Sequence, residues 1–258
     1  MSSEPRVERV AYGPDPQQWG ELWLPGPGLG PWPVTILLHG GFWRAPYTLE
    51  LMWPLAADLA GRGQAVWNLE YRRVGCSGGG WPGTLADVAA GIDALASLAG
   101  PWMLELGRVV LVGHSAGGQM ALWAAGRHSL GPDEVGAGPL VRPVHVVSLA
   151  GVSDLVEASR RAIGEDATAD FMGGSPESLP GPYEHASPLA RVPTGVPTLL
   201  VHGDADVRVP IGMSERYAAA ATAAGDQVET LLYEGVDHLG VIDPAAAPWR
   251  DVAARIWP

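Results

Sequence analysis

Two serines lie in the pattern Gly-x-Ser-x-Gly, which can present a serine hydroxyl for attack on a carbonyl carbon: Ser77 in GCSGG and Ser115 in GHSAG. Such a serine sits on a tight turn between a strand and a helix. The second pattern directly follows the apolar run VVLV (109–112) and continues into a helical stretch, whereas the first has no helix after it. Helix starts also favour serine as a cap, which is the simpler interpretation. The strand and helix around Ser115 favour it as a nucleophile, and Ser77 as a loop residue.

The negative oxygen created by such an attack needs preorganised N–H donors. One donor comes from the residue after the nucleophile, which is Ala116. We expect the others from the loop HGGFWR (39–44), with Gly41 and Phe42 as the backbone donors of this oxyanion hole. His39 in the same loop is predicted to brace it through hydrogen bonds and not to act as the catalytic base.

Short apolar runs alternate with longer helical stretches from Val34 onward, which is the pattern of a parallel sheet covered on both faces. In such a sheet the functional loops gather at the carboxyl ends of the strands. Strands are expected at 7–12, 21–24, 34–38, 65–69, 109–112, 144–149, 198–201 and 228–233, and helices at 49–63, 85–99, 116–128, 214–225 and 244–256.

The motifs HGGFW, GHSAGG and HGDADVRVP, in this order, resemble the α/β-hydrolase superfamily and in particular its small esterase and kynurenine formamidase (arylformamidase)-like members. The resemblance covers nearly the whole chain from about Val34 onward. It implies an α/β fold with a mostly parallel twisted sheet of about eight strands, helices on both faces and a small cap insertion.

The resemblance also implies a base and an acid that follow the serine in the order Ser, Asp, His. The pattern HG-x-x-D-x-x-V-P assigns the acid to Asp206, which leaves Asp204 as a turn residue. His238 lies after the last expected strand and is the predicted base. His238 would take the proton of Ser115, and Asp206 would orient the imidazole.

The substrate contacts are expected from the loop 39–44 and from an insertion. Trp43 and Arg44 are candidate substrate-binding residues, although a tryptophan is more often part of the core and an arginine as often a surface residue. One domain is expected over 1–258, because no linker divides the chain. Residues 150–197 are expected to form the cap insertion, which either shapes the substrate pocket or is an inert excursion.

The composition excludes several other functions. The net charge is −12, and all 16 basic residues are arginine, so Schiff-base, P-loop and Ser-Lys chemistry lack their lysine. The acidic balance argues against nucleic-acid and anionic membrane partners. A single cysteine permits no internal disulfide, and no leader or spanning segment is evident, so a cytoplasmic location is expected. No metal or organic cofactor is expected, and a homodimer is possible.

Three functions remain open at the level of the sequence. The leading prediction is a serine hydrolase that cleaves a small carboxylic ester through an acyl-enzyme. The first alternative is an arylformamidase acting on amides of the N-formylkynurenine type. The second alternative is a non-catalytic ligand-binding protein on a hydrolase fold.

Overall fold

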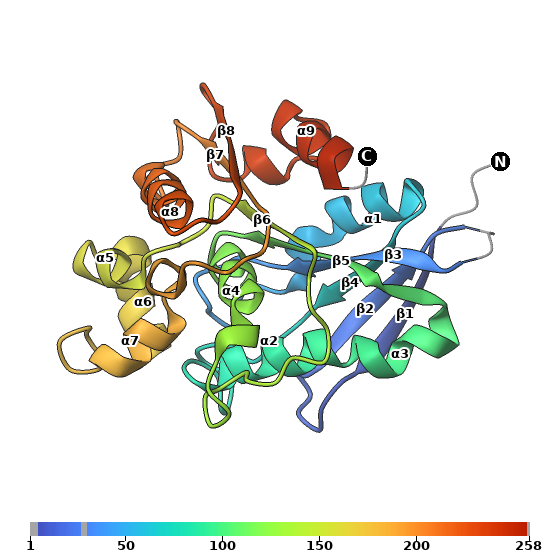
Figure 1. The fold of residues 1–258 in the computed structure, drawn as a ribbon, viewed down its shortest axis with the longest axis horizontal. Coiled ribbons are helices and arrows are strands. Elements are labelled where there is room, and N and C mark those ends of the chain that lie inside the picture. Colours follow the sequence, from blue (N-terminus) through green and yellow to red (C-terminus); the bar gives the residue numbers. More distant parts are fainter. Residues whose placement is uncertain (1–4, 27–29, 257–258) are drawn as a thin grey trace.

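The computed structural model describes residues 5–26 and 30–256, so the predicted domain limits 1 and 258 lie outside the described residues. One sheet of eight strands runs through the molecule in the order β1-β2-β4-β3-β5-β6-β7-β8 (Figure 1). The strands are β1 Arg6–Ala11, β2 Trp19–Leu24, β3 Trp32–Leu38, β4 Ala65–Leu69, β5 Leu104–His114, β6 His145–Leu149, β7 Thr198–Gly203 and β8 Val228–Tyr233. The pairs β1–β2 and β2–β4 are antiparallel, and the other strand pairs are parallel.

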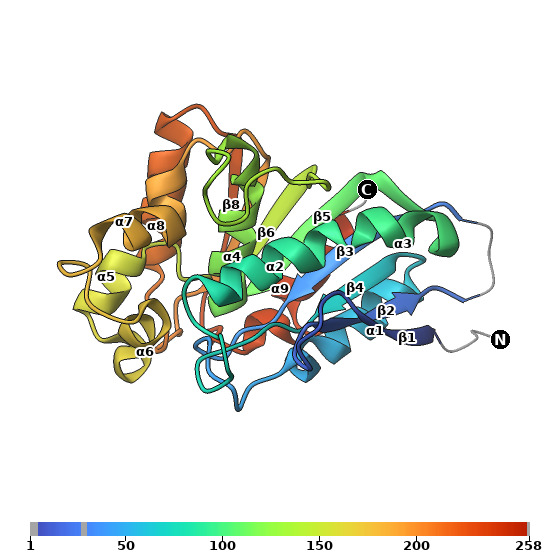
Figure 2. The same cartoon turned by 90° about the horizontal axis from the view of Figure 1, so that it is seen from below.

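Helices cover both faces of the sheet (Figure 2). On one face lie α1 (Trp53–Gly61) and α9 (Ala247–Ile256), and their buried side chains form one apolar cluster with alternate residues of the central strands. The opposite face is covered by α2 (Gly83–Asp93), α3 (Leu95–Trp102), α4 (Ala116–Ala125) and α8 (Gly212–Ala223). The predicted mostly parallel sheet with helices on both faces is confirmed.

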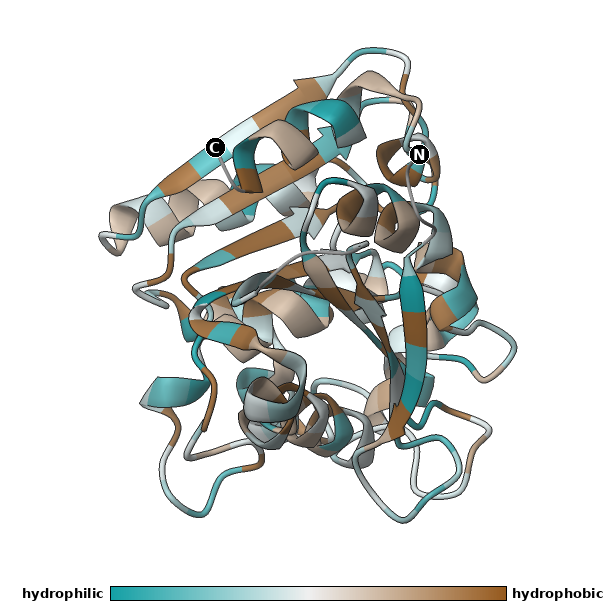
Figure 3. Cartoon of the chain, turned by 90° about the vertical axis from the view of Figure 1, so that its right-hand side faces the viewer, coloured by the Kyte–Doolittle hydropathy of each residue, from teal (hydrophilic) through white to brown (hydrophobic). Residues whose placement is uncertain are grey.

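The central strands bury both of their faces because successive side chains point to opposite sides. In β3, Ile36 and Leu38 enter the cluster beneath α2 and α4, whereas Leu37 enters the cluster beneath α1. Figure 3 shows the resulting hydrophobic colouring along the strands inside the molecule. This double burial anchors β3, β5 and β7 in the interior of the molecule.

Two predicted helices differ from the structure. The stretch 49–63 begins as the 3-10 turn η1 (Leu49–Met52), and α1 starts only at Trp53, with Pro54 in its first turn. Proline lacks an N–H, so it fits the start of a helix and not its interior. The stretch 85–99 divides at Ala94 into α2 and α3.

Residues 150–197 contain three further helices, α5 (Leu155–Arg160), α6 (Ile163–Met172) and α7 (Pro180–Ala186), and the 3-10 turn η3 (Pro188–Arg191). Both views place α5, α6 and α7 together at one end of the molecule (Figures 1 and 2). In the part of the chain that the structure describes, no helix combines the length and apolarity needed to cross a membrane.

Candidate active site

Ser115 stands on a tight turn between β5 and α4, as the sequence predicts. Its φ is +57°, an unfavourable angle for a residue with a side chain, and such strain is typical of functional turns. The turn leaves no room at its glycines: a Cβ on Gly117 would lie 2.0 Å from the carbonyl oxygen of Leu38, and one on Gly113 would lie 2.0 Å from that of Gly117. Ser115 is thus held at the carboxyl end of β5 by close backbone packing. Ser77 lies in an exposed turn.

Asp206 and His238 are brought together from the loops after β7 and β8. Asp206 Oδ2 lies 2.6 Å from His238 Nδ1, and because a carboxylate only accepts, Nδ1 carries the proton. Asp206 Oδ1 accepts from the amides of Arg208 at 2.8 Å and Val209 at 2.9 Å. Asp204 instead accepts from the amide of Gly235, which is the turn role expected for it.

The Asp206 carboxylate is ionised at neutral pH. Burial raises its pKa, but hydrogen bonds from His202, from His238 and from the Val209 amide outweigh burial and hold the pKa well below its usual range. A permanent negative charge therefore faces His238 Nδ1.

His114 connects the turn of Ser115 to the loop of His238. Its Nε2 lies 2.9 Å from the carbonyl oxygen of His238, so this nitrogen donates, and the two rings lie 4.6 Å apart between centroids. Burial, followed by the neighbouring His238, lowers the pKa of His114 to about 3, so its ring is neutral at neutral pH. His114, which directly precedes Ser115, thus holds the backbone of His238 through this hydrogen bond.

The loop 40–44 approaches the same turn. A Cβ on Gly40 would lie 2.9 Å from Ser115 Cβ, so the loop packs directly against the serine. Gly41 and Phe42 both have positive φ, at 109° and 56°. Among the residues that the structure describes, none accepts a hydrogen bond from the amide of Gly41, Phe42 or Ala116. These three amides are the predicted oxyanion donors, and that role stays a prediction.

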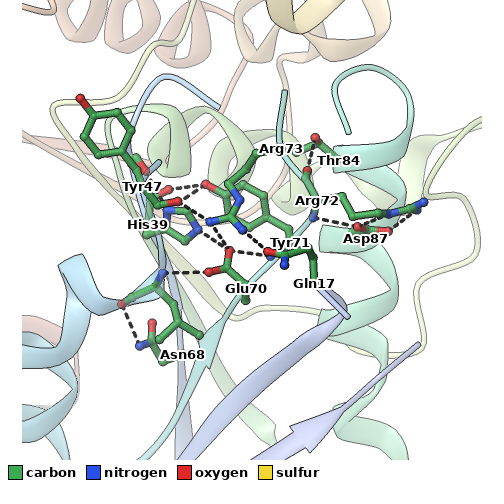
Figure 4. A network of polar contacts seen from close by, with 12 residues as sticks. Gln17, His39, Tyr47, Asn68, Glu70, Tyr71, Arg72, Arg73, Thr84 and Asp87 are labelled. Carbon is green, nitrogen blue, oxygen red and sulfur yellow. Dashed lines mark hydrogen bonds and ion pairs between the residues drawn. The ribbon is translucent and has the colours of Figure 1, made fainter. Parts of the chain in front are cut away.

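A buried polar network around His39 and Glu70 holds this loop in place (Figure 4). His39 Nδ1 lies 2.7 Å from the carbonyl oxygen of Gly40, and His39 Nε2 lies 2.9 Å from Glu70 Oε1. Glu70 also pairs with Arg73 at 3.0 Å, and Arg73 donates to the carbonyl oxygen of Tyr47. The bracing role predicted for His39 is therefore borne out.

Glu70 and Arg73 are the parts of this network that sequence reasoning missed. They follow β4, the parallel neighbour of β3, so their residue numbers place them at the same edge of the sheet as His39. The charged residues Glu70, Arg72 and Arg73 within four positions of the end of an apolar strand were the signal that could have revealed them.

Trp43 and Arg44 point toward the segment 150–197. Trp43 is 1% exposed, its Nε1 donates to Gln119 at 3.0 Å, and its ring stacks on Phe171 of α6 with centroids 4.7 Å apart. Arg44 pairs with Asp170 of α6 at 2.9 Å. Both side chains are engaged by the protein, and their contact with substrate stays a prediction.

The fold and the order of these motifs define the class of protein, one with the α/β-hydrolase fold. The chain belongs to the BD-FAE family, whose model matches residues 21–220.

Sequence relatives and solved structures agree with this class. The chain is 28% identical to a probable isoprenylcysteine alpha-carbonyl methylesterase from Oryza sativa subsp. japonica, over 91% of this chain and 58% of that protein. It spans just over half the length of the curated relatives it matches. A truncated carbohydrate esterase from gut microbiota has the same fold, with a TM-score of 0.83 and 21% identity over 99% of this chain and 95% of that one. Thermogutta terrifontis esterase 2 phosphorylated by paraoxon gives a TM-score of 0.74 and 20% identity over 98% and 92%.

Proposed function

We propose that this protein is a serine hydrolase that cleaves a small carboxylic ester, with Ser115 as nucleophile, His238 as general base and Asp206 as the residue that orients the base. The observation that carries the proposal is the 2.6 Å contact between Asp206 and His238, on loops that meet the strained turn of Ser115 through His114. This arrangement supports the chain order Ser, Asp, His of the superfamily.

The reaction has two halves. The Ser115 oxygen forms a bond to the ester carbonyl carbon while His238 Nε2 takes the hydroxyl proton, and the amides of Gly41, Phe42 and Ala116 bind the negative oxygen. The carbon–oxygen bond to the leaving alcohol then breaks, and His238 returns the proton to that alcohol. In the second half, His238 takes a proton from water, the water oxygen attacks the acyl carbon, and Ser115 leaves with the proton. The mechanism uses no metal or organic cofactor.

The ester is favoured over the formamide alternative because the sequence relatives are named as methylesterases and the similar solved structures as esterases. Comparing turnover of p-nitrophenyl acetate with that of N-formylkynurenine separates the two. Efficient ester turnover with negligible formamide turnover is expected, and the reverse would make the arylformamidase proposal the better one.

Covalent labelling tests the nucleophile. Paraoxon should add one diethylphosphoryl group to the wild-type protein, detected by intact mass and mapped to Ser115. Ser115→Ala should abolish labelling and lower kcat at least about a thousandfold, because serine nucleophile removal leaves only binding and oxyanion stabilisation.

Ser77→Ala is the matched control, since Ser77 lies in the other Gly-x-Ser-x-Gly pattern but in an exposed turn. It should be labelled and active like the wild type. A folded wild-type protein that paraoxon leaves unlabelled would instead support the non-catalytic receptor and end the enzyme proposal.

A further inference from the structure

A second imidazole, that of His202, contacts the Asp206 carboxylate in addition to His238. His202 belongs to β7 and is fully buried, and its Nε2 lies 3.2 Å from Asp206 Oδ2. This is the same oxygen that His238 Nδ1 approaches to 2.6 Å. One carboxylate oxygen therefore has two imidazole partners.

The proton position on His202 follows from its neighbours. Nε2 faces two acceptors, Asp206 Oδ2 and the carbonyl oxygen of Val209 at 3.0 Å, so Nε2 must carry a proton. Nδ1 lies 2.8 Å from Ser214 Oγ. In the tautomer that is protonated at Nε2 and bare at Nδ1, Ser214 donates to Nδ1. Ser214 is 1% exposed and belongs to α8, and this helix thus orients the ring.

We propose that His202, oriented by Ser214, is a positioning residue that holds the Asp206 carboxylate and sets how strongly it attracts the proton of His238. This inference rests on the proposed function. A hydrogen bond donated to a carboxylate stabilises its negative charge and weakens the pull of that charge on other protons. With His202 in place, the imidazolium of His238 is less favoured and its free base is available at lower pH.

Within the described part of the chain, three charged or titratable side chains lie around Asp206 and His238: His202, His114 and Arg208. His238 faces Asp206 and the ring of His114, and the positive charge of Arg208 lies close enough to act on His114. Asp206 faces His202 and His238. Loss of His202 therefore removes one of the two imidazole partners of Asp206, together with the contacts of His202 with Ser214 and with the carbonyl oxygen of Val209.

The direct test measures the tautomer of His202 in the wild-type protein by NMR with ¹⁵N-labelled histidine. A neutral ring protonated at Nε2 and bare at Nδ1 is expected. A ring bare at Nε2 would overturn the proposal without any variant, and so would a ring protonated at both nitrogens.

Three variants test the effect on His238, whose pKa is followed by the same NMR titration. His202→Leu removes the donor and should raise the pKa of His238 by roughly half to one pH unit. His202→Gln retains an amide donor and should remain near the wild type. Ser214→Ala leaves the His202 ring less firmly held, so the pKa of His238 in this variant should lie between those of His202→Gln and His202→Leu.

The matched control is His145→Leu, which removes a half-buried imidazole at the opposite, amino end of β6 and should leave the pKa of His238 unchanged. An unchanged pKa in a folded His202→Leu protein overturns the inference. If that variant does not fold, an unchanged pKa of His238 in Ser214→Ala has the same consequence.

The pH dependence of kcat/KM should shift in the same direction as the pKa of His238. In His202→Leu the acidic limb of the pH profile of kcat/KM should move to higher pH by the shift measured for His238, which loss of packing alone would not produce. The two proposals fail separately. If paraoxon does not label the wild-type protein, the hydrolase proposal fails. If the wild-type protein is labelled but the pKa of His238 is unchanged in His202→Leu, the role proposed for His202 fails.

Discussion

The Glu70 carboxylate binds partners that are far apart in the sequence. Oε1 faces His39 Nε2 at 2.9 Å and Arg73 Nη1 at 3.0 Å, and Oε2 accepts from the amide of Leu49 at 3.2 Å. Burial raises the pKa of Glu70, but His39 and then Arg73 lower it by more, so its pKa lies below the usual value. A single side chain thus holds the loop after β3 to the strand β4.

Glu70→Gln should lower the free energy of unfolding by about 3 kcal/mol, because it leaves the buried Arg73 guanidinium without its counter-charge. The change is measured by urea denaturation at neutral pH. Glu8→Gln is the matched control, since the pair of Glu8 with Arg6 is largely exposed and should be worth less than about 1 kcal/mol. Equal losses in the two variants would contradict the bracing role of Glu70.

The sequence alone predicts a residue's role when its surroundings are contiguous in the chain, but it does not predict contacts between segments that meet only in the folded sheet. Ser115 was predicted because its strand, turn and helix are contiguous in the chain. The contacts of His202 with Asp206 and Ser214 were missed because they depend on where β7, its loop and α8 meet. His202 stood inside the HGDADVRVP motif, which was the available signal.

At the scale of elements, the turn between β5 and α4 depends on the approach of α4 to β3. A Cβ on Gly117 would lie 2.0 Å from the carbonyl oxygen of Leu38 and 2.6 Å from that of His39. Both atoms are backbone atoms, which cannot rotate aside as a side chain can. The helix can accept a side chain there only by moving away from the sheet.

Gly117→Ala should therefore cost more than about 3 kcal/mol of stability or prevent folding, because overpacking against backbone is poorly relieved. Gly107→Ala on β5 is the matched control, since a Cβ there meets no atom within 4 Å. It should change stability by less than about 0.5 kcal/mol. The comparison is made by urea denaturation of both proteins, and similar stabilities would show that the turn tolerates a wider separation of α4 and β3.

At the scale of the whole molecule, the segment 150–197 is tied to the candidate site through α6. Arg44 donates to the carbonyl oxygen of Glu165 at 2.8 Å and pairs with Asp170 at 2.9 Å. The ring of Trp43 stacks on Phe171 of the same helix. The loop that carries the candidate oxyanion donors and the predicted cap are therefore in direct contact.

Asp170→Asn should weaken this connection with little effect on global stability, because the Arg44–Asp170 pair is partly exposed and worth less than about 1 kcal/mol. The amides of α6 should exchange with solvent faster, as followed by hydrogen exchange with mass spectrometry, and KM for the ester should rise. Glu177→Gln breaks a pair with Arg160 that lies within 150–197 and should not accelerate exchange in α6 to the same extent. Equal exchange in the two variants would show that Arg44 does not hold α6.

The sequence by itself determined the class of fold and the candidates along the chain. Apolar runs with helical stretches between them specify a doubly covered parallel sheet, since the burial of each strand depends on its own residues. The motifs then assign Ser115, Asp206 and His238 by order. Only the tertiary structure decided the contacts beneath these residues: His202 against Asp206, Glu70 against His39 and Arg44 against Asp170. Such contacts depend on strand register and on the packing of loops, which local periodicity does not encode.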